Sequence, residues 1–207
     1  MIALLDANLF VPTWIIDPLL SLAEAGLCEP AWSARVMDEA RLAIMEVRHV
    51  PDVRARGFLD AICRAFPMAM AEDWERFEPD VNLSDPNDGH VVAAARRAGA
   101  ETIVTFNLKD FPADELSRYG LHAQSPDVFL TSVFDAHPEE AMDAMRRLVS
   151  SKRHPPRTMS EEIRAFARLA PSAVRTEIVR NGRLIPVICN TANHTVGAIN
   201  AQSVNNR

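Results

Sequence analysis

The chain has 207 residues, of which 48% are hydrophobic, and a formal net charge of −6. This is enough for one domain with a sizeable core and an additional segment. No stretch approaches the roughly 18 uncharged apolar residues of a membrane-spanning helix, and the N-terminus lacks the basic region of a secretory signal. The three cysteines are widely spaced and predict neither a zinc site nor a disulfide framework, so a cytoplasmic location is expected.

Charge is distributed unevenly along the chain. Residues 1–136 contain 22 acidic and 11 basic residues, a balance of −11, whereas residues 137–207 contain 6 acidic and 11 basic residues, a balance of +5. A basic C-terminal segment that packs on an acidic domain would explain this pattern. Alternatively, the basic segment helps to hold a polyanion near an acidic, metal-binding site.

The N-terminal third predicts one strand followed by three helices. The apolar run that ends at Asp6 is typical of a strand buried on both faces, as in a parallel sheet. Helical spacing of apolar residues, with Ser33 and Gly26 as capping residues, predicts helices over residues 17–25, 34–47 and 53–66. Residues 68–84 predict only strand or loop.

The remainder of the chain continues the alternation of strands and helices. The turn Ser84–Asp88 opens a helix that ends at Gly99, and Ser125 caps a later one. Strands are predicted over residues 102–105 and 121–123, and amphipathic helices over residues 138–150 and 159–180. This order predicts an α/β domain with a mostly parallel sheet.

Four polar side chains are expected to meet at one edge of this sheet. Asp6 closes the first strand and Asn107 follows a later one, and the carboxyl ends of parallel strands share an edge. Glu39 lies beside the apolar face of its helix, and Asp88 begins another helix. Neighbouring carboxylates repel unless a divalent cation neutralises them, and oxygen-only ligands favour Mg²⁺ or Mn²⁺. Phosphodiester hydrolysis is the natural chemistry of such a site.

The chain resembles the PIN-domain family of nucleases in four short segments, which contain the four polar residues and follow the same order as in the family. The segments fall within residues 1–130 and read Leu4-Leu5-Asp6-Ala7-Asn8, Trp32-Ser33 through Asp38-Glu39, Asp85 through Ala95, and Ile103 through Phe111. The likeness is greatest to VapC-type toxins of type II toxin–antitoxin modules, whose longer members carry a helical extension. It implies a PIN-like three-layer α/β/α domain over residues 1–132 and an α-helical extension over residues 133–180. The polar residues 181–207 predict a disordered tail.

The resemblance implies an endoribonuclease that depends on Mg²⁺ or Mn²⁺ and hydrolyses RNA by a metal-activated water. By position, Asp6, Glu39 and Asp88 would be its catalytic and metal-binding acids. Asn107 stands where the family has a fourth acid, and a neutral amide would hold a second metal more weakly. The family also implies a cognate antitoxin and a homodimer.

Other side chains have weaker functional interpretations. Supporting roles are assigned to Asn8, to Asp85 or Asp110 as substitutes for the missing acid, and to Thr105, which could bind a phosphate or orient Asn107. Three basic side chains could contact the RNA backbone, namely Lys109, Arg96 and Arg97. His90 and His122 look isolated, and an ordinary structural histidine is the preferred interpretation of both.

Two rival functions remain at this stage. Asn107 keeps open a catalytically weak or silent PIN-like module that binds RNA or a protein partner. A phosphatase or phosphoacceptor protein would also place an aspartate after its first strand. The dehalogenase type of phosphatase requires a second aspartate two residues later, where this chain has Asn8, so this alternative fits poorly.

Overall fold

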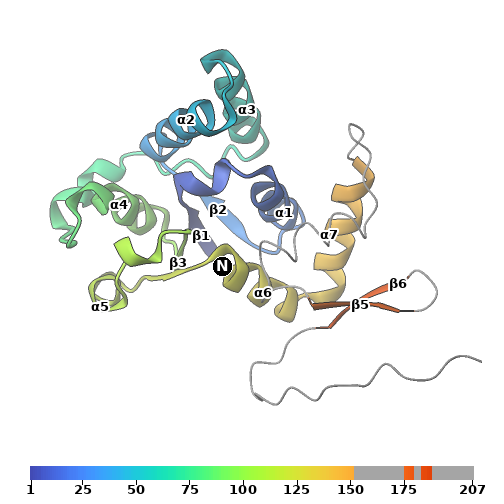
Figure 1. Ribbon diagram of the computed structural model, residues 1–207. Helices are drawn as coiled ribbons and strands as arrows, with labels where there is room; N and C mark the ends of the chain where they lie inside the picture. The colour runs from blue at the N-terminus through green and yellow to red at the C-terminus, as the bar shows by residue number, and fades with distance from the viewer. Residues whose placement is uncertain (152–174, 180–182, 188–207) are drawn as a thin grey trace, which may run out of the picture.

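A parallel four-stranded sheet forms the centre of the protein (Figure 1). The structure is a computed structural model that describes residues 1–151 and the backbone of residues 175–179 and 183–187. The strands have the order β2-β1-β3-β4, with bounds β1 Ile2–Leu5, β2 Glu29–Ala31, β3 Thr102–Val104 and β4 His122–Gln124. In the register of the sheet, Leu4 lies opposite Ala31 on one side and Ile103 on the other. The carboxyl ends of β1 and β3 are therefore adjacent, as predicted.

Helices lie on both sides of this sheet (Figure 1). α1 (Thr13–Glu24) packs against α7 (Pro138–Ser151) on one side, and α4 (Gly89–Ala98) packs against β1 and β3 on the other. The remaining α-helices are α2 Ala34–Arg48, α3 Asp52–Ala65, α5 Ala113–Leu116 and α6 Pro126–Ala136. Short 3-10 helices connect these elements, and they are η1 Ala7–Phe10, η2 Trp74–Asp80, η3 Pro86–Asp88, η4 Leu108–Asp110 and η5 Ser117–Tyr119.

The predicted capping residues define the ends of three helices. The Ser33 hydroxyl accepts a hydrogen bond from the Val36 N–H at 3.2 Å, and the Ser125 hydroxyl accepts one from the Val128 N–H at 3.3 Å. Gly99 ends α4 with a φ of +67°, a backbone conformation that a residue with a Cβ adopts only with strain. The predictions for these caps are confirmed.

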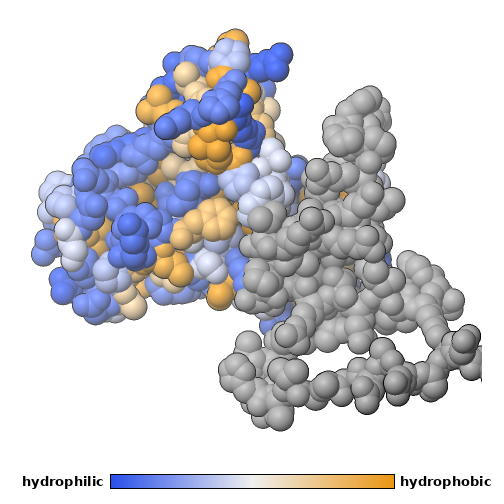
Figure 2. Space-filling view, in the orientation of Figure 1, coloured by the Kyte–Doolittle hydropathy of each residue, from blue (hydrophilic) through white to orange (hydrophobic). Residues whose placement is uncertain are grey.

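The core is apolar and continuous around β1, β3 and α4. α4 is buried on all sides over Gly89–Ala95, which is typical of a helix enclosed by other elements. A second aromatic centre surrounds Trp32, whose ring makes edge contacts with Phe10 at 5.7 Å and with Phe66 at 6.2 Å. Figure 2 shows hydrophobic surface over α2 and α3, where Leu42, Val47 and Val53 are exposed.

Several predicted boundaries differ from the structure. α1 begins at Thr13, one turn before the predicted start at residue 17, and contains Pro18. The strand β2 was not predicted, because Pro30 and Glu29 give it no strand pattern; proline is tolerated there since β2 is an edge strand. Residues 74–80 form the 3-10 helix η2 rather than strand or loop.

The C-terminal prediction is wrong in two places. Residues 175–179, near the end of the helix predicted over 159–180, form β5 (Arg175–Val179), and part of the predicted disordered tail forms β6 (Arg183–Val187). The two strands pair antiparallel. Other parts of these predictions lie outside the described residues. The domain boundary at residue 132 stays a prediction, although α6 runs through it without a break. Among the described residues, no helix is long and apolar enough to cross a membrane.

Candidate metal and nuclease site

Asp6 stands at the carboxyl end of β1, where it caps the 3-10 helix η1. Its Oδ1 accepts a hydrogen bond from the Ala7 N–H at 2.7 Å, and its Oδ2 accepts one from the Thr105 hydroxyl at 2.6 Å. Burial raises the pKa of Asp6 above its ordinary value, against the opposing effect of these two hydrogen bonds; nearby Glu39 raises this pKa further. The carboxylate is thus fixed in position but not charge-neutralised.

Thr105 joins the ends of β1 and β3. This fully buried hydroxyl donates to Asp6 and accepts from the Asn8 side-chain amide at 3.0 Å and from the Asn107 N–H at 2.9 Å. Asn8 also donates to Asp6 Oδ2 at 2.6 Å and accepts from the Phe106 N–H at 3.3 Å. Thr105 and Asn8 therefore orient the acidic site, and the interpretation that Thr105 orients Asn107 agrees with this geometry.

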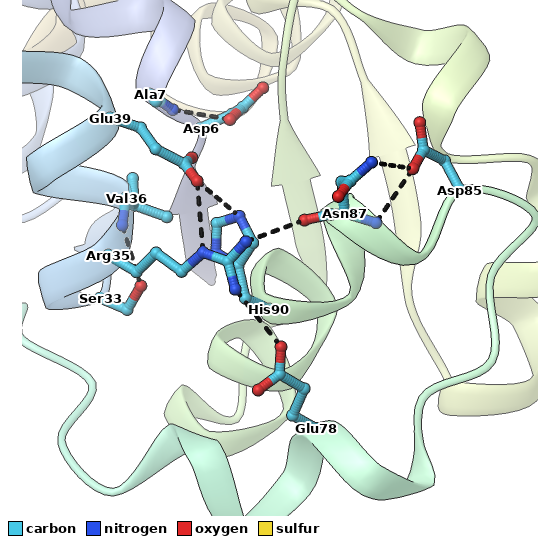
Figure 3. A network of polar contacts seen from close by, with 10 residues as sticks. All are labelled: Asp6, Ala7, Ser33, Arg35, Val36, Glu39, Glu78, Asp85, Asn87 and His90. Carbon is cyan, nitrogen blue, oxygen red and sulfur yellow. Dashed lines mark hydrogen bonds and ion pairs between the residues drawn. The ribbon is translucent and has the colours of Figure 1, made fainter. Parts of the chain in front are cut away.

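Glu39 projects from α2 toward the start of α4 (Figure 3). Its Oε1 lies 3.1 Å from Nε2 of His90 and 3.4 Å from Nε of Arg35. Arg35 also lies 3.5 Å from a carboxylate oxygen of Glu78 and donates to the Asn87 carbonyl at 3.5 Å. Burial acts to raise the pKa of Glu39, but His90 and Arg35 outweigh this effect and hold that pKa below its ordinary value.

Asp88 lies at the start of α4 among other acids. Burial, together with the negative charges of Asp110, Asp85 and Asp6, raises the pKa of Asp88 to about 6. Acids from three separate segments of the chain thus act on one carboxyl group. Asp85 itself caps the turn, since its Oδ1 accepts hydrogen bonds from the Asn87 N–H at 2.9 Å and the Asn87 side-chain amide at 3.0 Å.

Asn107 is paired with Asp110. The Asn107 side-chain amide donates to Asp110 Oδ2, while Nζ of Lys109 lies 3.9 Å from Asp110 Oδ1. The amide at position 107 therefore holds a carboxylate at the position where the fourth acid was expected. Asp110 and Asp85 both act on Asp88 through their charges, so both stay candidates to substitute for the missing acid.

The candidate RNA contacts differ in their availability. The Arg96 guanidinium lies over the rings of Phe77 at 5.4 Å and Tyr119 at 5.3 Å, and donates to the Phe77 carbonyl at 3.4 Å. These contacts give Arg96 a structural role. Arg97 is exposed, and the Lys109 side chain is 82% exposed and lies beside the acidic site.

The residues at this site fit a hard divalent cation. Their donors are carboxylate and amide oxygens, the ligands that Mg²⁺ and Mn²⁺ prefer. Burial and the negative charges of three nearby acids raise the pKa of Asp88, and a cation bound there would offset both effects. Within the part of the chain that the structure describes, no three acidic, histidine or cysteine side chains already converge as a metal site. Binding would therefore bring the acidic side chains closer together than they lie here.

Two side chains at the site were not assigned a role from the sequence. His90 was interpreted as isolated, but this interpretation is wrong because its ring contacts Glu39. The available signal was its position two residues after Asp88 and directly before the apolar run Val91–Ala95. Arg35 had no signal, since arginine on a helix surface is common. His122, in contrast, is exposed on β4.

Comparison with known protein families decides the fold family. The family model of the PIN domain matches residues 3–109, and that of the VapC50 C-terminal domain matches residues 126–176. The chain belongs to the PIN-domain family. The matched residues include Asp6, Glu39, Asp88 and Asn107. The match to the VapC50 C-terminal domain follows the PIN-domain match along the chain.

Two known proteins illustrate the relationship. A Mycobacterium tuberculosis protein with the provisional name ribonuclease VapC50 is 40% identical over 96 residues, which cover 41% of this chain and 57% of that protein. The matched part thus spans little more than half of the relative. The crystal structure of VapBC2 from Rickettsia felis, bound to a DNA fragment from their promoter, aligns with a TM-score of 0.43 and 19% identity, covering 60% of this chain and 98% of that one.

Proposed function

We propose that this PIN-domain protein is a Mg²⁺- or Mn²⁺-dependent endoribonuclease, and that it is the toxin of a type II toxin–antitoxin module. The environment of Asp88 is the observation that carries the proposal. Three other acids act on this carboxyl group, and such an arrangement is unfavourable unless a cation binds there. The relative named as a ribonuclease supports RNA as the substrate.

Each side chain of the site has a proposed role in catalysis. Asp6, Glu39 and Asp88 would hold the cation, and Asn107 or Asp110 would complete its coordination. When bound, a divalent cation stabilises charge on the phosphoryl group and acidifies a water molecule. Thr105 and Asn8 keep the Asp6 carboxylate oriented through hydrogen bonds at 2.6 Å. Lys109 and Arg97 are the exposed cations proposed to contact the RNA backbone.

The first test is RNA cleavage by the purified protein. We expect cleavage with Mg²⁺ or Mn²⁺ and none with excess EDTA. Replacing Asp6 by Asn keeps the size of the side chain but removes its charge, so we expect a loss of about 100-fold or more in rate, equivalent to about 2.7 kcal/mol. The matched control is Asp38→Asn on α2, because this side chain is 72% exposed and pairs with Arg41 at 3.4 Å. Equal cleavage in EDTA, or by Asp6→Asn, would sink the proposal.

A catalytically silent PIN-like binding module is the second candidate, and Asn107 is the observation that favours it. The two candidates differ in metal binding. Calorimetric titration with Mn²⁺ is expected to give a saturable, enthalpically detectable site if the protein is a nuclease. A silent module would bind Mn²⁺ weakly or not at all, and its RNA binding would not respond to EDTA.

The proposed antitoxin and homodimer have separate tests. An antitoxin should be encoded in the neighbouring reading frame, and its product should co-purify with this chain and suppress cleavage. Light scattering of the purified protein would measure its mass in solution, and twice the chain mass of 23.0 kDa is expected. A monomer would remove the dimer from the proposal without affecting the nuclease.

A further inference from the structure

We propose that His90 is a positioning residue, which holds the Glu39 carboxylate where it can take part in cation binding. This inference rests on the proposed function, because it assigns a role within that same site. The two residues come from different helices, Glu39 from α2 and His90 from the first turn of α4, and their side chains face each other (Figure 3).

The His90 ring is held on two sides. It is 1% exposed, its Nε2 lies 3.1 Å from Glu39 Oε1, and its centre lies 6.0 Å from the Trp74 ring at an interplanar angle of 64°. α4 packs against η2, the element that carries Trp74. The histidine therefore presents Nε2 to the carboxylate from a rigid, buried position.

The other ring nitrogen argues against a purely structural role. Nδ1 of His90 is buried and has no hydrogen-bond partner among the residues that the structure describes. Burying an unpartnered polar atom is unfavourable, and the neighbouring positions of α4 are valine and alanine. An apolar side chain at position 90 would not bury an unpartnered nitrogen. The contact between Nε2 and Glu39 therefore explains why this position is a histidine.

Glu39 needs such a partner because its other contact is weak. The Arg35 side chain is 43% exposed and divides its donors between Glu39, Glu78 and the carbonyl of Asn87. Exposed ion pairs of this kind contribute little and are screened by salt. Both His90 and Arg35 contact Oε1, so Oε2 is the oxygen that we assign to the cation.

Two substitutions at position 90 separate positioning from structure. His90→Met removes the donor and keeps an apolar side chain that fills the site, whereas His90→Gln keeps an N–H donor. By calorimetry with Mn²⁺ on the 207-residue chain, we expect His90→Met to bind about 10- to 100-fold more weakly, as is typical when a partner of a metal ligand is lost. We expect His90→Gln to recover most of this affinity. In EDTA, His90→Met should melt at the same temperature as the wild type or higher.

The controls make each result decisive. His122→Met replaces an exposed histidine on β4 and should leave Mn²⁺ affinity unchanged. In a Glu39→Ala background, His90→Met should have no further effect, because the two residues act as one unit. Undiminished affinity in His90→Met would overturn the inference alone, as would a fall in its metal-free melting temperature of more than about 4 °C. Absence of Mn²⁺ binding by the wild type would overturn the proposed function as well.

Discussion

At the scale of single residues, the carboxyl groups of the site differ in their burial, their hydrogen bonds and the charges near them. Asp6 is half-buried and receives hydrogen bonds from Ala7 and Thr105, whereas Glu39 has cationic and hydrogen-bonding partners. Burial and the negative charges of three other acids raise the pKa of Asp88 to about 6. These differences predict that Asp88 is the acid whose protonation competes most with a cation near neutral pH.

Mn²⁺ affinity should therefore depend on pH through Asp88. Because the pKa of the folded, metal-free group is about 6, its carboxylate is charged above that pH and protonated below it. The affinity should fall about tenfold per pH unit below about pH 6, for one proton displaced. Calorimetry across this range would measure how the logarithm of the Mn²⁺ affinity changes with pH. In Asp88→Asn, the number of protons displaced on binding should fall by about one. A constant affinity from about pH 5 to pH 7 would contradict this assignment.

Asp88 also affects the stability of the metal-free protein. Its contribution to the free energy of unfolding falls as pH rises, whereas that of a salt-bridged acid rises with pH. Its pKa in the folded state lies above the ordinary value of 3.8. The folded state therefore binds more protons than the unfolded state between these values. The contribution of Asp88 to stability falls as pH rises through about 6, and is most favourable below 3.8.

At the scale of elements, helix caps place the acids. Ser33 begins α2, and the helix then carries Arg35 and Glu39 toward the site. Ser125 makes the same type of cap at α6, which carries none of the site acids. The two helices thus offer a matched pair of cap positions, one connected to the site and the other remote from it.

Replacing either capping serine by alanine should destabilise the protein by about 1 kcal/mol, because a backbone N–H at the helix start loses its acceptor. Urea denaturation of Ser33→Ala and Ser125→Ala would measure these losses. Only Ser33→Ala should also weaken Mn²⁺ binding, since it loosens the first turn of α2 next to Glu39. Equal Mn²⁺ affinities in the two variants would show that the α2 cap does not position the site.

At the scale of the whole molecule, the site joins segments that are distant in the sequence. The ends of β1 and β3, the second turn of α2 and the start of α4 meet at the carboxyl edge of the sheet. A cation bound by all of them would link these elements and favour the folded state. The role of the basic C-terminal segment stays a prediction, because most of residues 137–207 lies outside the described residues.

Metal should therefore raise the melting temperature of the protein. At about 100 times the dissociation constant, a ligand specific for the folded state adds about 2.7 kcal/mol. For a chain of this length, that corresponds to about 5–10 °C. Thermal scans in Mn²⁺ and in EDTA at matched ionic strength would measure the shift, and Asp6→Asn should lose most of it. A shift of equal size in Asp6→Asn would place the stabilising ion elsewhere.

The fold was largely predictable because its main signals are local. The apolar run before Asp6 and the caps at Ser33 and Gly99 set strands and helices through neighbouring residues in the sequence. The failures have local causes too: β2 contains Pro30 and is only three residues long, so no periodicity marks it. At the C-terminus, β5 stands near the end of a predicted helix and β6 in the predicted disordered tail. The two strands pair with each other, and a helical pattern in the sequence does not indicate such pairing.

The sequence by itself determined the local elements and predicted the acids of the candidate site, since Asp6 and Asp88 stand at the end of a strand and the start of a helix. Only the tertiary structure decided how these acids are held. Thr105 reaches Asp6 across the sheet, Asn107 pairs with Asp110, and His90 meets Glu39 from another helix. These contacts depend on the packing of α4 and α2 around the sheet edge. Local sequence patterns specify the helices and strands. The hydrogen-bond partner of a buried polar atom depends instead on which helices and strands pack together in the core.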